Sequence, residues 1–329
     1  MAKASPSDNL DTLRQIANNP GDRISVQNLR KSGRMTARER VNALLDSDSF
    51  VEIDAFIQHR SGDHNLHLHK PLGDGVVAGH GMLDGRRIVC FAQDYSIFEG
   101  TMGEMHAKKI SKIVEFAEKS MLPVIGIWDG DGQRAHEGVS SLGATGELLD
   151  IFAACSGRIP IISLILGTVS GVSALAAGLS DFVILGSEHG QMFMRSPYFI
   201  PEVVSGEIDE ETLGGAESHS SRSGIACLVA DDEHDAINIA AEILGYLPDH
   251  TLAEPLNVKS IDEWNRSCKK LEDIVPSDSN KPYDMSEVIS EVVDEGRFME
   301  LFPSYAENIL IGFARLDGQS IGIVAVSYT

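Results

Sequence analysis

Two stretches of the sequence decide its fold. The first is the apolar run Val124-Ile-Gly-Ile-Trp128, which continues into Asp129-Gly-Asp-Gly-Gln-Arg-Ala-His-Glu-Gly138. The second is Pro160-Ile-Ile-Ser-Leu-Ile-Leu-Gly167, followed by Thr168-Val-Ser-Gly-Val-Ser-Ala-Leu-Ala-Ala177. In each stretch a buried strand runs through a glycine-containing loop into a helix. Backbone N–H groups then gather at one edge of a sheet, where α/β enzymes bind and polarise ligands. The pair of units therefore favours an enzyme over a simple binding module.

The flanking segments show the same alternation of strands and helices. Strand-like runs at 75–79 and 81–92 predict a hairpin, because Asp84-Gly85 is a favoured two-residue turn. The segment from Met105 to Lys119 carries apolar residues at helical spacing, and Phe182-Val-Ile-Leu185 is typical of a buried strand. This order predicts a mostly parallel, layered α/β domain.

The two ends of the chain predict further units. Residues 1–34 are polar and predict a helical arm, whereas residues 35–260 hold the α/β domain. Residues 261–329 predict linker helices and then a hairpin at 309–325, which echoes the strand, Asp-Gly turn and strand at 75–92. We interpret the echo as the opening of a truncated second domain of the same kind.

Charge and composition limit the classes of partner. The chain has 329 residues, 43% of them apolar and 23% charged, with a formal net charge of −22. Without a basic excess, nucleic acid is excluded as the main partner, although local Lys and Arg can still hold a ligand's phosphates. No apolar run approaches the length of a membrane span, and the N-terminus lacks the apolar stretch of a signal peptide.

Cysteine and histidine spacing predicts neither disulfides nor a metal centre. The four cysteines are widely scattered and form no CxxC pair: Cys90, Cys155, Cys227 and Cys268. We therefore expect reduced thiols and a cytoplasmic protein. His64, His67 and His69 alternate in a polar loop, and solvated side chains are the commoner reason for such a pattern.

Short motifs also follow one another in a recognisable order from about Met35 to the C-terminus. They include Thr36-Ala-Arg-Glu-Arg40, Gly73-Asp-Gly-Val-Val77, His106-Ala-Lys-Lys-Ile110, Leu213-Gly-Gly-Ala216 and Tyr305-Ala-Glu-Asn308. Together they resemble the first half of the carboxyltransferase (beta) subunit of biotin-dependent acyl-CoA carboxylases, of the propionyl-CoA carboxylase type. The resemblance implies a crotonase/ClpP-like layered β-β-α superhelix domain, followed by the start of a second similar domain.

The resemblance also implies a chemistry. Such enzymes move CO2 between N1 of biotin, carried by a biotin carboxylase or carrier partner, and the enolate of an acyl-CoA or acyl-carrier thioester. No metal takes part, and the subunits form homo- or hetero-oligomers, because each active site joins domains of two subunits. Backbone N–H groups at Gly171 and Val172 would stabilise the enolate oxygen at a helix N-terminus.

Further residues are candidates for contact with the substrate. They are Gly130, Gly132, Gln133, Arg134, Gly167, Ser170, Arg195 and Ser196. Competing interpretations stay open for several positions. The glycines could serve close packing alone, and Arg134 with Glu137 could form a structural ion pair. Asp131 and His136 could form an acid–base pair or be solvated. Lys108 and Lys109, or Arg222, could meet CoA phosphates or lie on a solvated face, while residues 192–194 are expected in the core.

The chain departs from the family pattern where the chemistry is expected. The family normally has Asp-Ser-Gly-Gly-Ala-Arg where this chain has Asp129-Gly-Asp-Gly-Gln-Arg134, and Gly-Pro where it has Gly167-Thr168. A Thr-Gly-Pro-Asp-like run becomes Arg195-Ser-Pro-Tyr198, and two adjacent glycines become Gly171-Val172. A positive φ at Val172 would make it a strained outlier and indicate lost or altered activity. A negative φ would keep its N–H available while the side chain narrows the pocket.

Two rival functions follow from these departures. A malonyl-type thioester decarboxylase needs the same enolate site and no biotin site. A catalytically silent assembly subunit would tolerate the substituted glycines.

Overall fold

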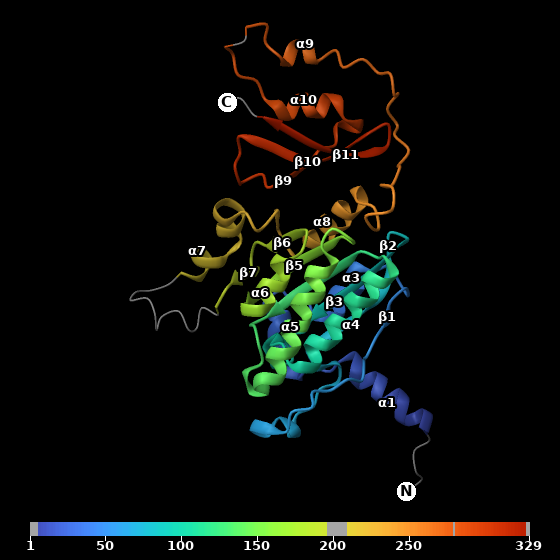
Figure 1. Cartoon of the computed structure of the whole chain (residues 1–329), viewed down its shortest axis with the longest axis vertical. Helices are drawn as coiled ribbons and strands as arrows, with labels where there is room; N and C mark the ends of the chain where they lie inside the picture. Colours follow the sequence, from blue (N-terminus) through green and yellow to red (C-terminus); the bar gives the residue numbers. More distant parts are fainter. Residues whose placement is uncertain (1–5, 196–208, 279, 327–329) are drawn as a thin grey trace.

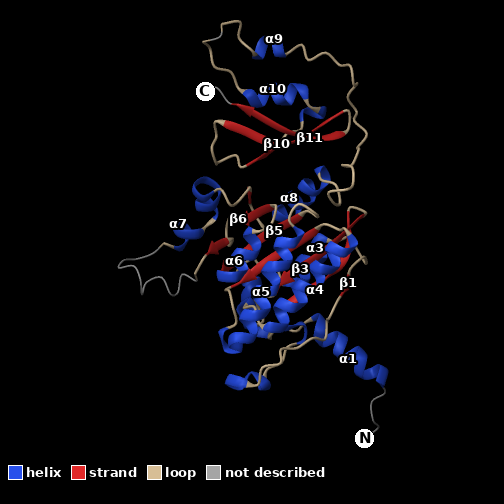
Figure 2. Ribbon diagram, viewed as in Figure 1, coloured by secondary structure: helices blue, strands red, loops and turns tan. Residues whose placement is uncertain are grey.

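The computed structural model describes residues 6–195, 209–278 and 280–326. Its main body is a large sheet with helices on both faces, and a separate three-stranded sheet lies at one end (Figures 1 and 2). The strands of the main sheet run in the order β1-β2-β3-β4-β5-β6-β8, with β7 paired to β5. The β1–β2 and β2–β3 pairs are antiparallel and the remaining pairs are parallel, which confirms the predicted α/β class.

Strands β2 to β6 lie where the sequence predicted strands, with small differences in length, whereas the short strands β1, β7 and β8 were not predicted. Their bounds are β1 (Val51–Glu52), β2 (Val76–Leu83), β3 (Arg86–Gln93), β4 (Val124–Gly130), β5 (Ile161–Ser170), β6 (Phe182–Gly186), β7 (Gln191–Phe193) and β8 (Leu228–Ala230). The Asp84-Gly85 turn joins β2 to β3, and both of its residues have positive φ. Strand β5 runs three residues beyond its expected end at Gly167, and this extension carries Ser170 to the edge of the sheet.

Helices cover both faces of this sheet. The first face carries α4 (Glu104–Ser120), α5 (Gly138–Cys155) and α6 (Gly171–Gly178), while α3 (Ala37–Leu44) and α8 (Glu233–Tyr246) cover the second. Under the first layer, the fully buried Trp128 ring packs edge-on against Phe91 at 5.0 Å and donates a 2.8 Å hydrogen bond to Ser163 Oγ. This aromatic packing fixes β4 near its carboxyl end, two residues before the strand passes into the glycine-rich loop.

Residues 192–194 do not all lie in the core as expected. Met192 and Phe193 are each 5% exposed, but Met194 is 70% exposed because β7 ends at Phe193. The remaining helices are α1 (Pro6–Asn18), α2 (Arg23–Lys31), α7 (Glu210–Gly214), α9 (Leu271–Ile274) and α10 (Met285–Val292). Helices α1 and α2 lie within the segment that was predicted to be a polar, helical arm.

The second sheet repeats the opening of the first. Its strands are β9 (Met299–Leu301), β10 (Ile309–Leu316) and β11 (Gln319–Val326), and α10 packs on one face. Gly79 in β2 lies against the carbonyl of Val51, and Gly312 in β10 lies in the same way against the carbonyl of Met299. The echo noticed in the hairpin therefore extends to the preceding strand and helix. The domain boundaries at 34/35 and 260/261 stay predictions.

Most of the thiols lie in the interior of the protein. All four cysteines are free, and three of them are buried. Within the described residues, no helix is long and apolar enough to cross a membrane.

Candidate active site

The ends of β4 and β5 lie side by side at one edge of the main sheet. Their pairing shifts register after Trp128, so that Gly130 lies opposite Val169. Helix α6 begins at Gly171, the residue directly after the end of β5. Gly171 has φ +56°, a conformation that glycine adopts without steric cost. The first N–H groups of a helix have no partner within it and carry its partial positive charge. The start of α6 can therefore hold a developing oxyanion.

Val172 does not have a strained backbone. It follows Gly171 within α6 and is not among the residues with positive φ. The positive φ belongs to Gly171, the glycine that this chain keeps. The first interpretation, a strained Val172, is therefore excluded, and the second stays a prediction: the Val172 N–H is available and its side chain narrows the space beside it.

A buried cluster of charges fixes the end of β4. The Asp129 carboxylate is fully buried and pairs with Arg34 and, at 2.6 Å, with Arg40 Nη1. Arg40 Nε also donates to Glu233 Oε2 at 2.9 Å, and these carboxylates raise the pKa of Arg40 against the cost of its burial. The sequence analysis missed this cluster, although Arg40 belongs to the Thr36–Arg40 motif. A fixed strand end keeps the loop that follows it in one place.

Arg134 forms an ion pair with Glu137, as one of the two interpretations of these residues predicted. Its guanidinium is buried, and Nη1 donates to Asp74 Oδ1 at 2.7 Å and to Glu137 Oε1 at 2.8 Å. Nη2 donates to the carbonyl of Thr101 at 2.9 Å. Burial raises the pKa of Asp74, and the charge of Arg134 opposes that rise. The geometry gives Arg134 the role of holding the 130–137 loop, and its contact with substrate stays a prediction.

The loop glycines are needed mainly for close approach. A Cβ at Gly130 would overlap the carbonyl oxygen of Gly100, and a Cβ at Gly167 would overlap the Asp129 carboxylate. Gly132 has φ +74°, and a Cβ there would lie 2.9 Å from Ser170 Oγ. Close packing therefore explains why Gly130 and Gly167 lack a side chain. Gly132 allows the loop backbone to pack directly against Ser170.

Asp131 is joined to Ser170 at the start of α6. Ser170 Oγ donates to Asp131 Oδ1 at 2.6 Å. His136 instead packs its ring edge-on against His64, with centroids 5.5 Å apart. Among the described residues, no group of three or more His, Cys, Asp or Glu side chains is placed to hold a metal ion.

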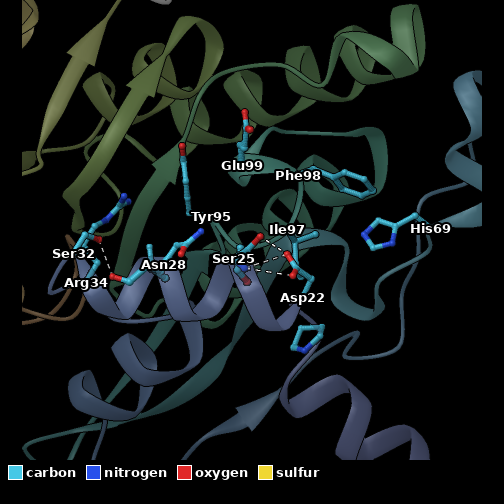
Figure 3. A pocket seen from close by; sticks show the side chains of 13 residues that line it. Asp22, Ser25, Asn28, Ser32, Arg34, His69, Tyr95, Ile97, Phe98 and Glu99 are labelled. Carbon is cyan, nitrogen blue, oxygen red and sulfur yellow. Dashed lines mark hydrogen bonds between the residues drawn. The ribbon is translucent and has the colours of Figure 1, made fainter.

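A cavity of about 620 Å³ opens between α2 and the 95–99 loop. Figure 3 shows Asp22 and Ser25 on α2 and its cap, with Tyr95 and Glu99 on the opposing loop. The carbonyl of Glu99, one of the lining residues, accepts a 3.4 Å hydrogen bond from the N–H of Asp131. The sequence did not indicate this cavity, because its lining comes from segments far apart in the chain.

The other candidates lie in different surroundings. Gln133 is partly buried, and its backbone forms an isolated parallel β-bridge with Met102. Arg195 follows β7 and is exposed. Ser196 lies outside the described residues. Lys109 is buried and donates to the carbonyl of Val76 at 2.7 Å, so it does not lie on a solvated face. Lys108 pairs with Glu104 at 2.8 Å and Arg222 is exposed.

The fold is that of the crotonase-like α/β class of enzymes. The chain belongs to the carboxyl transferase domain family, whose model matches residues 28–329. This confirms the resemblance inferred from the motifs.

Named relatives agree with this assignment. The chain is 41% identical to the biotin-dependent acetyl-/propionyl-coenzyme A carboxylase beta5 subunit of Mycobacterium tuberculosis, over 96% of this chain and 59% of the relative. It is 40% identical to the methylmalonyl-CoA decarboxylase subunit alpha of Veillonella parvula, over 93% of this chain and 60% of the relative. The transcarboxylase 12S structure with bound methylmalonyl-coenzyme A superposes with a TM-score of 0.95 at 34% identity, over 99% of this chain and 64% of that one. The chain thus spans 59–64% of the length of these proteins.

Proposed function

We propose that this chain binds an acyl-CoA or acyl-carrier thioester and takes part in moving CO2 between its α-carbon and carboxybiotin. The observation that carries the proposal is the start of α6, which begins at Gly171 with a positive φ directly after the buried Ser170 at the end of β5. We expect the N–H groups of Gly171 and Val172 to be the donors there. Relatives named as biotin-dependent carboxylase and decarboxylase subunits support it.

In the proposed mechanism the thioester carbonyl oxygen lies at the N–H groups of Gly171 and Val172. Negative charge develops on that oxygen as the enolate forms, and preorganised donors lower the energy of this state more than that of the substrate. Removing one such donor costs about 3–4 kcal/mol in other enzymes. The Asp129 and Arg134 ion pairs keep both loops in position while the charge moves.

Biotin would supply the carboxyl group from a partner protein. We place its binding groups in the unit that begins with α10, of which the structure describes one helix and three strands. The residues of the main sheet then bind and polarise the thioester, and the partner brings the second reactant to it. The free thiols agree with a cytoplasmic setting.

A second subunit would close the site. Apolar side chains are exposed on α5, on α6 and directly after α6: Val139, Leu142, Leu175 and Leu179. An exposed apolar patch at a site is typical of a surface that another protein covers. We therefore expect an oligomer in which a second subunit packs on α5 and α6.

Decarboxylation of a malonyl-type thioester without biotin is the second candidate function. The relative named methylmalonyl-CoA decarboxylase subunit alpha favours it. A silent subunit is less favoured, because Val172 leaves the helix N-terminus intact.

Calorimetric titration with propionyl-CoA tests the proposed site. Replacing Val172 by Trp fills the space beside the donors, and we expect binding at least about tenfold weaker. Val275→Trp is the matched control, since Val275 lies after α9 and is 41% exposed. Equal affinity in both variants, or no binding by the parent protein, would overturn the proposal.

A further inference from the structure

A chain of hydrogen bonds runs through the core to the end of β4. It starts at the carbonyl of Asp74, which accepts at 3.0 Å from Nδ1 of His106 on α4. Nε2 of the same ring lies 3.3 Å from Nε2 of Gln93, the last residue of β3. Gln93 Oε1 in turn accepts from the N–H of Asp129 at 3.0 Å. The three residues His106, Gln93 and Asp129 are each 0% exposed, so bulk water does not compete for these hydrogen bonds.

The two ends of this chain fix the direction of every hydrogen bond in it. A carbonyl oxygen only accepts and a backbone N–H only donates. Nδ1 of His106 therefore carries the proton, and the Gln93 amide turns its NH2 group to Nε2 and its oxygen to Asp129. Nε2 has to keep its lone pair, so the ring is neutral. Burial, together with the positive charges of Arg134 and Lys109, lowers the pKa of His106 to about 3 and keeps the ring in this form.

The last hydrogen bond holds the residue at which β4 leaves the regular sheet. The pairing of β3 with β4 ends at Ile127, so the Gln93 side chain takes the place of a backbone carbonyl as the partner of the Asp129 N–H. The pairing of β4 with β5 shifts register at the same point, between residues 128 and 130. An irregularity of this kind aims the segment that follows it. That segment, residues 130–134, contains several of the candidate substrate contacts.

His106 is also tied to the other end of this segment. Its N–H donates to Asp74 Oδ2 at 3.0 Å, and Asp74 Oδ1 accepts from Arg134 Nη1 at 2.7 Å. His106 thus reaches Asp129 through Gln93 and Arg134 through Asp74. One buried ring therefore connects both ends of the 129–134 segment.

We propose that Gln93 and His106 are positioning residues for thioester binding: the His106 ring orients the Gln93 amide, and this amide holds Asp129 so that residues 130–134 keep their binding conformation. This proposal rests on the proposed function, because the ligand is the thioester assigned there. Both side chains are fully buried and act through the N–H of Asp129. Because they act through one hydrogen bond, their effects on affinity do not add, whereas two independent structural roles would add.

Calorimetric titration of the full chain with propionyl-CoA tests the proposal through two replacements of His106. His106→Gln places an amide oxygen near the position of Nε2, where it can accept from Gln93. His106→Asn is too short for this and keeps only a donor for the carbonyl of Asp74. We expect the Kd of His106→Gln to stay within about twofold of the parent protein and that of His106→Asn to rise about fivefold or more, the value of one hydrogen bond.

A double-variant cycle separates positioning from stability. Gln93→Met should weaken binding as much as His106→Asn does, and adding His106→Asn to Gln93→Met should weaken it no further. Hydrogen exchange followed by mass spectrometry reports the segment itself, and the peptide that covers residues 129–134 should exchange faster in both single variants. Ser111→Ala is the control, because Ser111 is a buried polar residue of α4 whose Oγ has no hydrogen-bond partner among the described residues. It should match the parent protein in both measurements.

The parent protein alone provides a further test. NMR of the 15N-histidine-labelled chain should show His106 as a neutral ring with its proton on Nδ1, its signal identified by its loss in His106→Gln. A proton on Nε2, an unchanged Kd in His106→Asn, or additive effects in the double variant would overturn this proposal and leave the proposed function standing. Absence of propionyl-CoA binding by the parent protein would overturn the proposed function and this proposal with it.

Discussion

The ion pairs of Arg134 give the sharpest prediction about what holds the loop after β4. Arg134→Met keeps the length of the side chain and removes its charge, which leaves Asp74 and Glu137 without their shared cation; these carboxylates are 0% and 2% exposed. Removing one partner of a buried pair typically destabilises a protein by about 3–5 kcal/mol, because the remaining charge stays buried. We expect a loss of this size at pH 7.

Urea unfolding followed by fluorescence measures this loss. Trp128 lies in the core under the loop and reports unfolding, whereas Trp264 is 83% exposed and contributes a nearly constant signal. Lys119→Met is the control: its pair with Glu115 is 3.2 Å long but both side chains are exposed, so the loss should be about 0–1 kcal/mol.

The same variant carries a pH signature. Burial already raises the pKa of Asp74, and without Arg134 to oppose it the rise becomes larger. A carboxyl group whose pKa is higher in the folded state binds more protons there, so the variant recovers stability as the pH falls. A loss equal to that of Lys119→Met, or a deficit that does not shrink between pH 7 and pH 5, would refute the reasoning.

Three other predictions follow from the buried residues. Burial lowers the pKa of His106 from 6.5 to about 3. Between these two values the unfolded state binds more protons than the folded state, so the free energy of unfolding decreases as the pH is lowered. The His106→Gln variant should lack this contribution, which is up to about 1.4 kcal/mol per pH unit in urea unfolding. Gly130→Ala should lower the free energy of unfolding by about 1–3 kcal/mol because its Cβ has no room, whereas Gly143→Ala in α5 has open space and should stabilise by about 0.5–1 kcal/mol; equal effects would contradict the packing role of Gly130. Iodoacetamide at pH 8 should label Cys268 first, because the three other thiols are buried and burial raises their pKa; peptide mass spectrometry showing prior labelling of any of them would contradict the fold.

Local patterns predicted most of the fold. Apolar runs, the Asp84-Gly85 turn and helical spacing depend on neighbouring residues, and the structure confirms the elements they indicated. The echo between the two hairpins was visible for the same reason. The exposed Met194 was predicted wrongly, because an apolar sequence does not reveal that β7 ends one residue earlier.

The candidate site was predictable only in part. The start of α6 follows from a strand, a glycine and a run of small residues, all adjacent in the chain. The Asp129–Arg40 and Arg134–Asp74 pairs join residues that are far apart, and no sequence spacing indicates them. The Asp131–Ser170 contact also depends on the register shift between β4 and β5, which only the structure shows.

The most direct test of the central claim follows malonyl-CoA and methylmalonyl-CoA by mass spectrometry in the presence of the purified chain, with and without free biotin. If the site forms a thioester enolate and exchanges its carboxyl group with biotin, CO2 is lost from one or both compounds only in the tube that contains biotin. Loss without biotin would replace carboxyl transfer by decarboxylation as the function. Unchanged compounds in both tubes would contradict the claim that this chain handles a carboxylated thioester.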